Sequence, residues 1–281
     1  MATPRRTVEL HSRDFEWEEL ARACRDEKHD AHDDDGDVGE LGDVAKSKWD
    51  EFHQRNNGEC LVSVHLGGKA YKPRNYLTQE FPELLRESPV RVLEVGCGYG
   101  SAIFPILQEC PQVTADVCDF SASAIEILRQ NPQYDPSRCN AFVCDITQDE
   151  LGLPDESVDV VLMVFVLSAL PPAEFEATLQ KVARVVKPGG VVCLRDYGLY
   201  DLAMRRNAKR IAPSLYYRSD GTLAYFFSRE DINRLFAEQL GFEVVENEYC
   251  TVRLVNRKKQ VTMDRVWIHA KCRKPIESKE T

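Results

Sequence analysis

The sequence has no long apolar run: no segment approaches the roughly eighteen consecutive apolar residues that a membrane-spanning helix requires. Residues 1–9 include Arg5 and Arg6, but no apolar stretch follows them, so we expect no secretory leader. Acidic residues come soon afterwards, which disfavours a mitochondrial presequence. These absences predict a protein of the cytoplasm, or of the cytoplasm and nucleus, with no membrane partner.

Metal-binding spacings are also absent, although the chain has ten cysteines. No Cys-x-x-Cys pair occurs, and several cysteines fall inside apolar segments that are typical of strands. We therefore expect reduced thiols in the core and no metal site.

Basic residues are too few to balance the acidic ones, and the formal net charge is -10. An acidic chain is a poor general partner for nucleic acid. The charge is segregated, however: residues 1–194 carry 19 basic and 34 acidic side chains, whereas residues 195–281 carry 17 and 12. A polyanionic partner would therefore meet the C-terminal third of the chain.

Residues 90–100 are the most informative about the fold, because a short apolar run ends there in glycines spaced Gly-x-Gly-x-Gly. This pattern is typical of a buried parallel strand that turns sharply into a helix beneath a nucleotide. Gly96 and Gly98 would let the backbone approach a ligand that a Cβ would block. Glu94 precedes the glycines, and their spacing differs from the Gly-x-Gly-x-x-Gly of dinucleotide sites. Both features favour S-adenosylmethionine over NAD as the cofactor.

Strand and helix patterns alternate after this turn, which predicts an α/β fold with a mostly parallel, doubly wound sheet. Two C-terminal strands predict an antiparallel hairpin, completing the seven-stranded, Rossmann-like sheet of class I S-adenosylmethionine-dependent methyltransferases. The predicted strands are residues 90–95, 113–118, 141–144, 158–166, 191–195, 242–248 and 262–271, and the predicted helices are residues 101–109, 121–130, 172–186 and 228–240, with a turn at residues 187–190.

The N-terminal part differs from this core in composition. Residues 1–45 include an aspartate-rich stretch at residues 30–37, so we expect an extended or disordered acidic extension. Within it, Phe15, Trp17 and Leu20 are spaced as a short amphipathic piece that docks on the core.

A helix is predicted over residues 46–54, where Trp49, Phe52 and His53 fall close to one face. It either packs its aromatic residues on the core or covers a ligand. The expected units of the chain are the extension, a cap at residues 46–89, the methyltransferase domain with its basic C-terminal part at residues 90–275, and a tail at residues 276–281.

Acidic residues follow the second and third predicted strands, where the cofactor needs them. Asp119 lies about twenty residues after the glycines, where a carboxylate accepts both ribose hydroxyls, and Asp116 is its nearby competitor. Asp145 ends the third strand, where it would bind the adenine amine while Ile146 covers the ring. The alternative is that both carboxylates merely cap loops.

The end of the fourth strand, residues 165–169, disfavours one common acceptor. It lacks the Asp/Asn-Pro-Pro-aromatic quartet with which many enzymes hold an exocyclic amine, and the prolines at 171 and 172 come too late. Adenine N6 methylation is therefore disfavoured. No cysteine follows a proline, so the usual nucleophile of the cytosine C5 methyltransferases is also missing. After the fifth strand, Arg195 and Asp196 are adjacent, so we expect only one of them to face the ligand.

Two basic and aromatic clusters are candidates for RNA contact. The first contains Tyr71, Lys72, Arg74 and Tyr76, residue types that stack on bases and pair with phosphates. The second contains Arg257, Lys258 and Lys259, which we expect to contact phosphates. The alternative for both clusters is that they are ordinary solvent-exposed surface residues without a ligand.

Several segments are more distinctive than the glycine turn, above all Arg195-Asp196-Tyr197-Gly198 and Asp220-Gly221-Thr222. The others are residues 118–121, 131–139, 165–169, 187–189 and 216–227. Together they resemble the METL family, the methyltransferase-like enzymes that make 3-methylcytidine in the anticodon loop of tRNA. The resemblance extends over residues 48–275 and implies tRNA as substrate, with position 32 as the expected target. It also implies that some members recruit an aminoacyl-tRNA synthetase, the seryl enzyme in one branch.

The resemblance also implies a cofactor site. Its residues would be Trp49, Gly96, Asp119, Asp145, Ile146 and Val164, with Gly98 beside them and His53 where a tyrosine is expected. In the RNA-contacting segment, Tyr71, Lys72 and Arg74 match the family, whereas the residues around them depart from it.

Our hypothesis for the chemistry is in-line displacement of the sulfonium methyl by cytidine N3, which is unprotonated at neutral pH and needs no strong base. A carboxylate would stabilise the positive charge that develops on the base. Asp196 is the candidate, with Tyr197 for stacking or hydrogen bonding. The alternative for Asp196 is that it pairs with Arg195 or Arg205 and only braces the loop. Two other functions stay open: a small-molecule methyltransferase, and a non-catalytic RNA adaptor that binds the cofactor.

Overall fold

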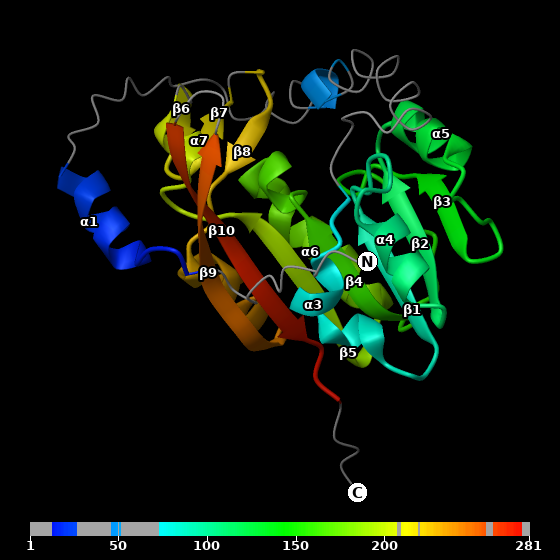
Figure 1. Cartoon of the computed structure of the whole chain (residues 1–281). Coiled ribbons are helices and arrows are strands. Elements are labelled where there is room, and N and C mark those ends of the chain that lie inside the picture. Colours follow the sequence, from blue (N-terminus) through cyan, green and yellow to red (C-terminus); the bar gives the residue numbers. More distant parts are fainter. Residues whose placement is uncertain are drawn as a thin grey trace, which may run out of the picture.

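A seven-stranded sheet forms the centre of the computed structural model, which describes residues 13–26, 46–49, 51, 73–206, 209–218, 220–256 and 261–276 (Figure 1). The strand order is β3-β2-β1-β4-β5-β10-β9. Pairings are parallel from β3 to β5, and β10 is antiparallel to both β5 and β9. The predicted Rossmann-like fold with its antiparallel hairpin is confirmed. The strands are β1 (Val90–Val95), β2 (Val113–Asp119), β3 (Cys139–Val143), β4 (Val158–Val164), β5 (Val186–Tyr197), β9 (Glu243–Asn256) and β10 (Val261–Arg273).

Both faces of the sheet are covered, because its strands carry buried apolar residues on each side. In β1, Leu93 and Val95 belong to one apolar cluster, whereas Val90 and Val92 belong to the other. The first cluster includes residues of α6 (Phe175–Val185), α8 (Arg229–Ile232) and the π-helical turn Asn233–Glu238. The second includes residues of α3 (Leu77–Glu80), the 3-10 turn Pro82–Leu85, α4 (Ile103–Glu109) and α5 (Ala122–Gln130).

Local capping explains where several helices begin. Ser121 accepts a hydrogen bond from the Ala124 N–H, so α5 begins with a serine cap. Ser228 and Asp231 form a reciprocal capping box at the start of α8. At the other end of this helical segment, Gly241 adopts a φ of +68°, a conformation that commonly ends helices.

Several predicted boundaries are wrong. β9 continues to Asn256 and does not end at residue 248. β4 ends at Val164 and not at residue 166, because Phe165 leaves the strand with φ +58°. β5 begins at Val186, so the predicted turn at residues 187–190 lies inside the strand, beside a register shift opposite β4. The helix predicted at residues 172–186 begins instead with a 3-10 turn at Pro172–Glu174.

The N-terminal residues include a helix, α1 (Trp17–Asp26), so the expectation of an extended or disordered chain is wrong there. The predicted docking is confirmed for Trp17, whose indole N–H donates to the Leu199 carbonyl at 3.1 Å and whose ring stacks on Tyr249 at 4.3 Å. The aspartate-rich stretch at residues 30–37 lies outside the described residues.

A second, three-stranded antiparallel sheet was not predicted. It contains β6 (Lys209–Ala212), β7 (Leu215–Tyr217) and β8 (Leu223–Tyr225), in that order, and follows the short helix α7 (Leu202–Arg205). Figure 1 shows this sheet close to the ends of β9 and β10. It packs against the 3-10 turn Leu167–Ala169 that follows β4.

The cysteines that the structure describes are all buried, as expected for core thiols. Among the described residues, no helix is long and apolar enough to span a membrane.

Candidate active site

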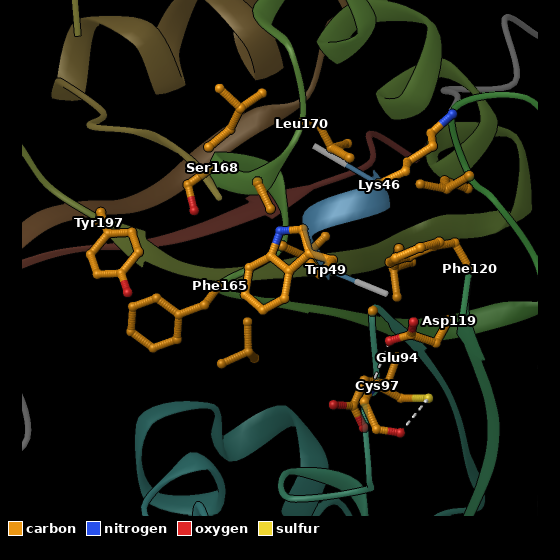
Figure 2. Close-up of a pocket in the computed structure, with 18 of the residues that line it drawn as sticks. Lys46, Trp49, Glu94, Cys97, Asp119, Phe120, Phe165, Ser168, Leu170 and Tyr197 are labelled. Carbon is orange, nitrogen blue, oxygen red and sulfur yellow. Dashed lines mark hydrogen bonds between the residues drawn. The ribbon is translucent and has the colours of Figure 1, made fainter. Parts of the chain in front are cut away.

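A cavity of about 360 Å³ lies where β1, β2, β4 and β5 end, and it has two differently built halves. One half contains the glycine turn, Asp119 and Asp145, and the other contains Phe165, Tyr197 and Trp267. Figure 2 shows the Trp49 indole between Phe120 on one side and Phe165 with Tyr197 on the other. We call these the cofactor half and the acceptor half.

The glycine turn forms one wall of the cofactor half. Gly96 and Gly98 have φ of +66° and +51°, a region that residues with a Cβ rarely adopt. A Cβ on Gly96 would lie 1.8 Å from Cγ2 of Val166, whereas a Cβ on Gly98 would meet nothing within 4 Å. Gly96 is therefore needed for packing, and Gly98 leaves open space beside the cavity.

Glu94 is buried on the wall of the cofactor half and is 3% exposed. Burial raises its pKa to about 8, against the opposing effect of the Arg74 charge. Its Oε2 atom has no hydrogen-bond partner among the described residues. Glu94 is thus a buried acid with one oxygen that makes no hydrogen bond to the described residues, and the sequence indicated it only as part of the glycine motif.

Asp119 lines the cavity as predicted. Its Oδ2 accepts the Gly98 N–H at 2.9 Å and its Oδ1 accepts the Ser121 N–H at 3.0 Å, so the carboxylate is fixed relative to the glycine turn. The competing Asp116 is not among the lining residues, because it pairs with Arg91 at 2.8 Å and accepts a hydrogen bond from Asn140 at 2.9 Å.

Asp119→Asn should weaken cofactor binding about 10- to 100-fold, because an amide nitrogen cannot accept the hydrogen bonds that one carboxylate oxygen accepts. Isothermal titration calorimetry with S-adenosylmethionine measures this change. The control is Asp116→Asn, which alters a neighbouring carboxylate outside the cavity and should leave the affinity unchanged. Equal losses in the two variants would contradict the assignment of Asp119.

Asp145, Ile146 and Val164 also line the cofactor half, as predicted. Lys46 forms an ion pair with Asp145 at 2.6 Å, which the sequence did not predict. Burial disfavours the charge on Asp145, but hydrogen bonds from Lys46 and Thr147 outweigh this effect and lower its pKa. Trp49 lines the cavity from the same helical segment as Lys46. His53 lies outside the described residues.

Aromatic rings dominate the acceptor half. The Phe165 ring lies 5.1 Å from the Tyr197 ring and 6.2 Å from the Trp267 ring, measured between centroids. The left-handed backbone conformation of Phe165 is unusual for an aromatic residue, and such strain is concentrated at functional sites. The Arg74 guanidinium lies 4.9 Å from the centre of the Phe165 ring. The Tyr197 and Trp267 rings are inclined to the Phe165 ring by 56° and 79°, so the three form an angled apolar wall with Arg74 at its border.

Two further arginines complete the acceptor half, and the sequence did not indicate them. Arg265 binds the fully buried Asp201 through Nε at 2.8 Å and Nη2 at 3.2 Å. Arg218 donates to the Tyr197 hydroxyl at 3.4 Å. Burial raises the pKa of Tyr197, which therefore stays a neutral phenol. Alternation along β10 places Arg265 and Trp267 on the same face of the strand, but the sequence does not show that this face borders the cavity.

The expectation that Asp196 faces the ligand does not fit the structure. Asp196 is 0% exposed and is not among the residues that line the cavity. Its carboxylate accepts the Ser168 N–H at 2.9 Å and the Tyr197 N–H at 2.8 Å. Burial raises its pKa to about 6 despite these hydrogen bonds. Asp196 braces the turn after β4 through Ser168, and neither Arg195 nor Arg205 is its hydrogen-bond partner there.

Asp196→Asn should therefore lower stability and turnover together. The asparagine amide presents two N–H donors and one acceptor, so one of the two backbone N–H groups loses its partner inside the protein. We expect a loss of about 1–3 kcal/mol in the free energy of unfolding, and a drop in turnover of about 10-fold or more as the turn shifts. Chemical unfolding and single-turnover kinetics measure these effects. Normal stability with lost turnover would instead support direct contact with the substrate.

The predicted RNA-contacting residues are only partly described. Arg74 lies at the cavity and donates to the Tyr76 hydroxyl at 3.4 Å. Tyr76 lies behind Arg74 and is not among the lining residues. Tyr71, Lys72, Arg257, Lys258 and Lys259 lie outside the described residues.

The cofactor half fits S-adenosylmethionine. Glu94 offers a cationic ligand a buried carboxylate oxygen that has no hydrogen-bond partner among the described residues, and Asp119 places a carboxylate, the acceptor that hydroxyl donors need, on the cavity wall. Gly98 leaves space where a Cβ would stand. Asp145 and Ile146 add a polar and an apolar contact.

Comparison with known proteins agrees with this site. A family model described as a methyltransferase domain matches residues 93–192. The chain resembles a SAM-dependent methyltransferase from Anabaena variabilis ATCC 29413 in structure, with a TM-score of 0.57 over 81% of this chain and 94% of that one at 14% identity, which shows the shared fold.

Sequence relatives are closer. The chain is 41% identical to the human tRNA N(3)-cytidine methyltransferase METTL6 over 240 residues, which cover 82% of this chain and 81% of that protein. It is 44% identical to tRNA N(3)-cytidine methyltransferase METTL2 of Danio rerio over 272 residues, covering 82% and 76%. The chain therefore belongs to the family of tRNA N(3)-cytidine methyltransferases.

Proposed function

We propose that the protein transfers a methyl group from S-adenosylmethionine to N3 of a cytidine in the anticodon loop of tRNA. The observation that carries the proposal is that a cofactor half and an aromatic acceptor half adjoin in one cavity. A neutral, planar base suits the surface formed by Phe165, Tyr197 and Trp267, because bases stack on aromatic rings. The named activity of the relatives supports the same reaction.

The reaction demands positioning more than acid–base catalysis. Bound in the cofactor half, S-adenosylmethionine supplies an electrophilic methyl group. The N3 lone pair is free at neutral pH, so no side chain has to remove a proton. The positive charge moves over a short distance and its total is unchanged, which limits the electrostatic stabilisation that the protein must add. The aromatic rings would hold the base in line, and such orientation supplies much of a catalytic effect.

Basic residues near the three-stranded sheet are suited to the tRNA backbone. Arg206 and Lys209 are exposed, and Arg218 lies at the acceptor half. They belong to the C-terminal third, where the net charge is positive although the whole chain is acidic. Phosphate contacts of this kind contribute affinity without reading sequence.

We also propose that a partner protein helps the enzyme to select its tRNA. The family resemblance supports an aminoacyl-tRNA synthetase, the seryl enzyme in one branch. We place the reaction in the cytoplasm, or in the cytoplasm and nucleus. Methylation of tRNA with and without added seryl-tRNA synthetase tests this partnership. A rate that the synthetase leaves unchanged would contradict it.

Incubation with labelled S-adenosylmethionine and total tRNA, followed by digestion to nucleosides, tests the function. We expect the label in 3-methylcytidine. Label in a small-molecule fraction of a cell extract, with none in tRNA, would support a small-molecule methyltransferase. Binding of cofactor and tRNA without any transfer would support an RNA adaptor.

A further inference from the structure

A buried ionic cluster lies beneath the acceptor half. Arg195 on β5 pairs with Glu80 on α3, and the two are 5% and 9% exposed. The second Glu80 oxygen lies 4.0 Å from Nδ1 of His269, whose Nε2 lies 2.8 Å from Glu246. Lys271 extends the cluster, with Glu246 at 2.7 Å and Glu83 at 3.0 Å. We call these residues the Arg195 cluster.

Arg195 connects this cluster to the cavity wall. Its guanidinium lies 4.8 Å from the centre of the Tyr76 ring and 4.7 Å from that of the Trp267 ring. Trp267 lines the acceptor half directly. Tyr76 contacts Arg74, which lines the cavity and lies over Phe165. One buried guanidinium thus contacts one ring of the acceptor half, Trp267, and a second ring, Tyr76, that accepts a hydrogen bond from the cavity residue Arg74.

Stability alone does not explain a charge at this place. Removing two ions from water costs free energy that their attraction often does not offset. Apolar residues of similar volume frequently stabilise a protein as well or better. A guanidinium held at a fixed angle has another use, because its flat face stacks on aromatic rings and fixes their orientation. Glu80 fixes that angle from α3, the helix that directly follows Tyr76.

We propose that Glu80 and Arg195 are positioning residues for the methyl acceptor: the carboxylate orients the guanidinium, and the guanidinium fixes Trp267 directly and Arg74 through Tyr76. The proposal rests on the proposed function, in which a base occupies the acceptor half. Neither residue lines the cavity, so both act through their neighbours.

Four variants test the proposal: Glu80→Gln, Arg195→Met, the double variant with both changes, and Glu83→Gln as the control. Glu83 is also an acidic partner in the Arg195 cluster, but it pairs with Lys271 and not with Arg195. The measurements are thermal unfolding, S-adenosylmethionine affinity by calorimetry, and the single-turnover rate and KM with tRNA.

Each single variant of the pair should lose stability, because it leaves one buried charge without its partner. The double variant should recover stability but keep a rate constant lowered about 10- to 100-fold, the range expected when a reacting group is misplaced by about 1 Å. Cofactor affinity should stay within about 2-fold of wild type. Glu83→Gln should keep the wild-type rate constant. Recovery of the rate in the double variant would overturn the proposal.

A second measurement is independent of the reaction. The chain has three tryptophans, so 5-fluorotryptophan labelling gives three fluorine resonances, and Trp267→Phe assigns one of them. The Trp267 resonance should shift or broaden in Arg195→Met and in the double variant but not in Glu83→Gln. An unchanged resonance in Arg195→Met would refute the positioning role. Failure of the wild type to make 3-methylcytidine would instead refute the proposed function.

Discussion

Glu94→Gln should make the cofactor-free protein more stable than the wild type at pH 8.5 but not at pH 4.5. The Glu94 carboxyl has a pKa of about 8 in the folded protein, against an ordinary value of 4.5, because burial disfavours its charge. The folded protein therefore holds a proton that the unfolded chain releases between these values, and stability falls as pH rises through this window. Above pH 8 the free energy of unfolding of the variant should exceed that of the wild type by on the order of 5 kcal/mol.

Denaturant unfolding at a series of pH values measures this effect as the difference between wild type and variant. Burial also raises the pKa of Asp196, to about 6, so the ionisation of Asp196 lowers stability at lower pH. Both proteins contain Asp196, so its contribution cancels in the difference. A cationic ligand should bind better as Glu94 ionises, so cofactor affinity should rise with pH up to about 8 in the wild type only. Identical pH profiles in the two proteins would contradict the assignment of Glu94.

The cofactor half could be predicted from the sequence because its residues follow the ends of consecutive strands. Gly96 follows β1, Asp119 is the last residue of β2, and Asp145 comes two residues after β3 ends; parallel strands bring these ends to one edge of the sheet. Local patterns therefore sufficed. Lys46 was missed because its partner Asp145 lies about a hundred residues away and no periodicity connects them.

The acceptor half could not be predicted in the same way, since it depends on contacts between distant segments. Arg265 and Asp201 meet only because the antiparallel β10 pairs with β5. Alternation showed that Arg195 and Asp196 point to opposite faces, but it could not show that neither lines the cavity. The extra sheet at residues 209–225 consists of strands of three or four residues, too short for a periodic signal.

Strain explains the boundary that was placed wrongly after β4. The run of apolar residues through Val166 predicted a longer strand, but Phe165 adopts a left-handed conformation and turns its ring toward Tyr197. Nothing in a hydrophobic pattern reports such a conformation. The resulting turn packs Val166 against the backbone of Gly96, so the two cavity walls depend on each other.

Gly96→Ala should destabilise the protein severely and abolish cofactor binding. The new methyl group would lie 1.8 Å from Cγ2 of Val166, and the backbone would keep a φ of +66° that alanine disfavours. Strain of about 1–2 kcal/mol and overpacking of about 1–3 kcal/mol predict a total loss of about 2–5 kcal/mol. Thermal unfolding should show a drop of roughly 5–15 °C for a chain of this size.

Gly98→Ala is the matched control, because its backbone has the same unfavourable sign of φ but its Cβ would meet nothing within 4 Å. Its free energy of unfolding should fall only by the backbone strain of about 1–2 kcal/mol, while the methyl group beside the cavity lowers cofactor affinity. Gly96→Ala combined with Val166→Ala removes much of the overlap and should recover part of the lost stability. Equal unfolding temperatures for Gly96→Ala and Gly98→Ala would show that the contact between Gly96 and Val166 contributes nothing, and that backbone strain alone explains both glycines.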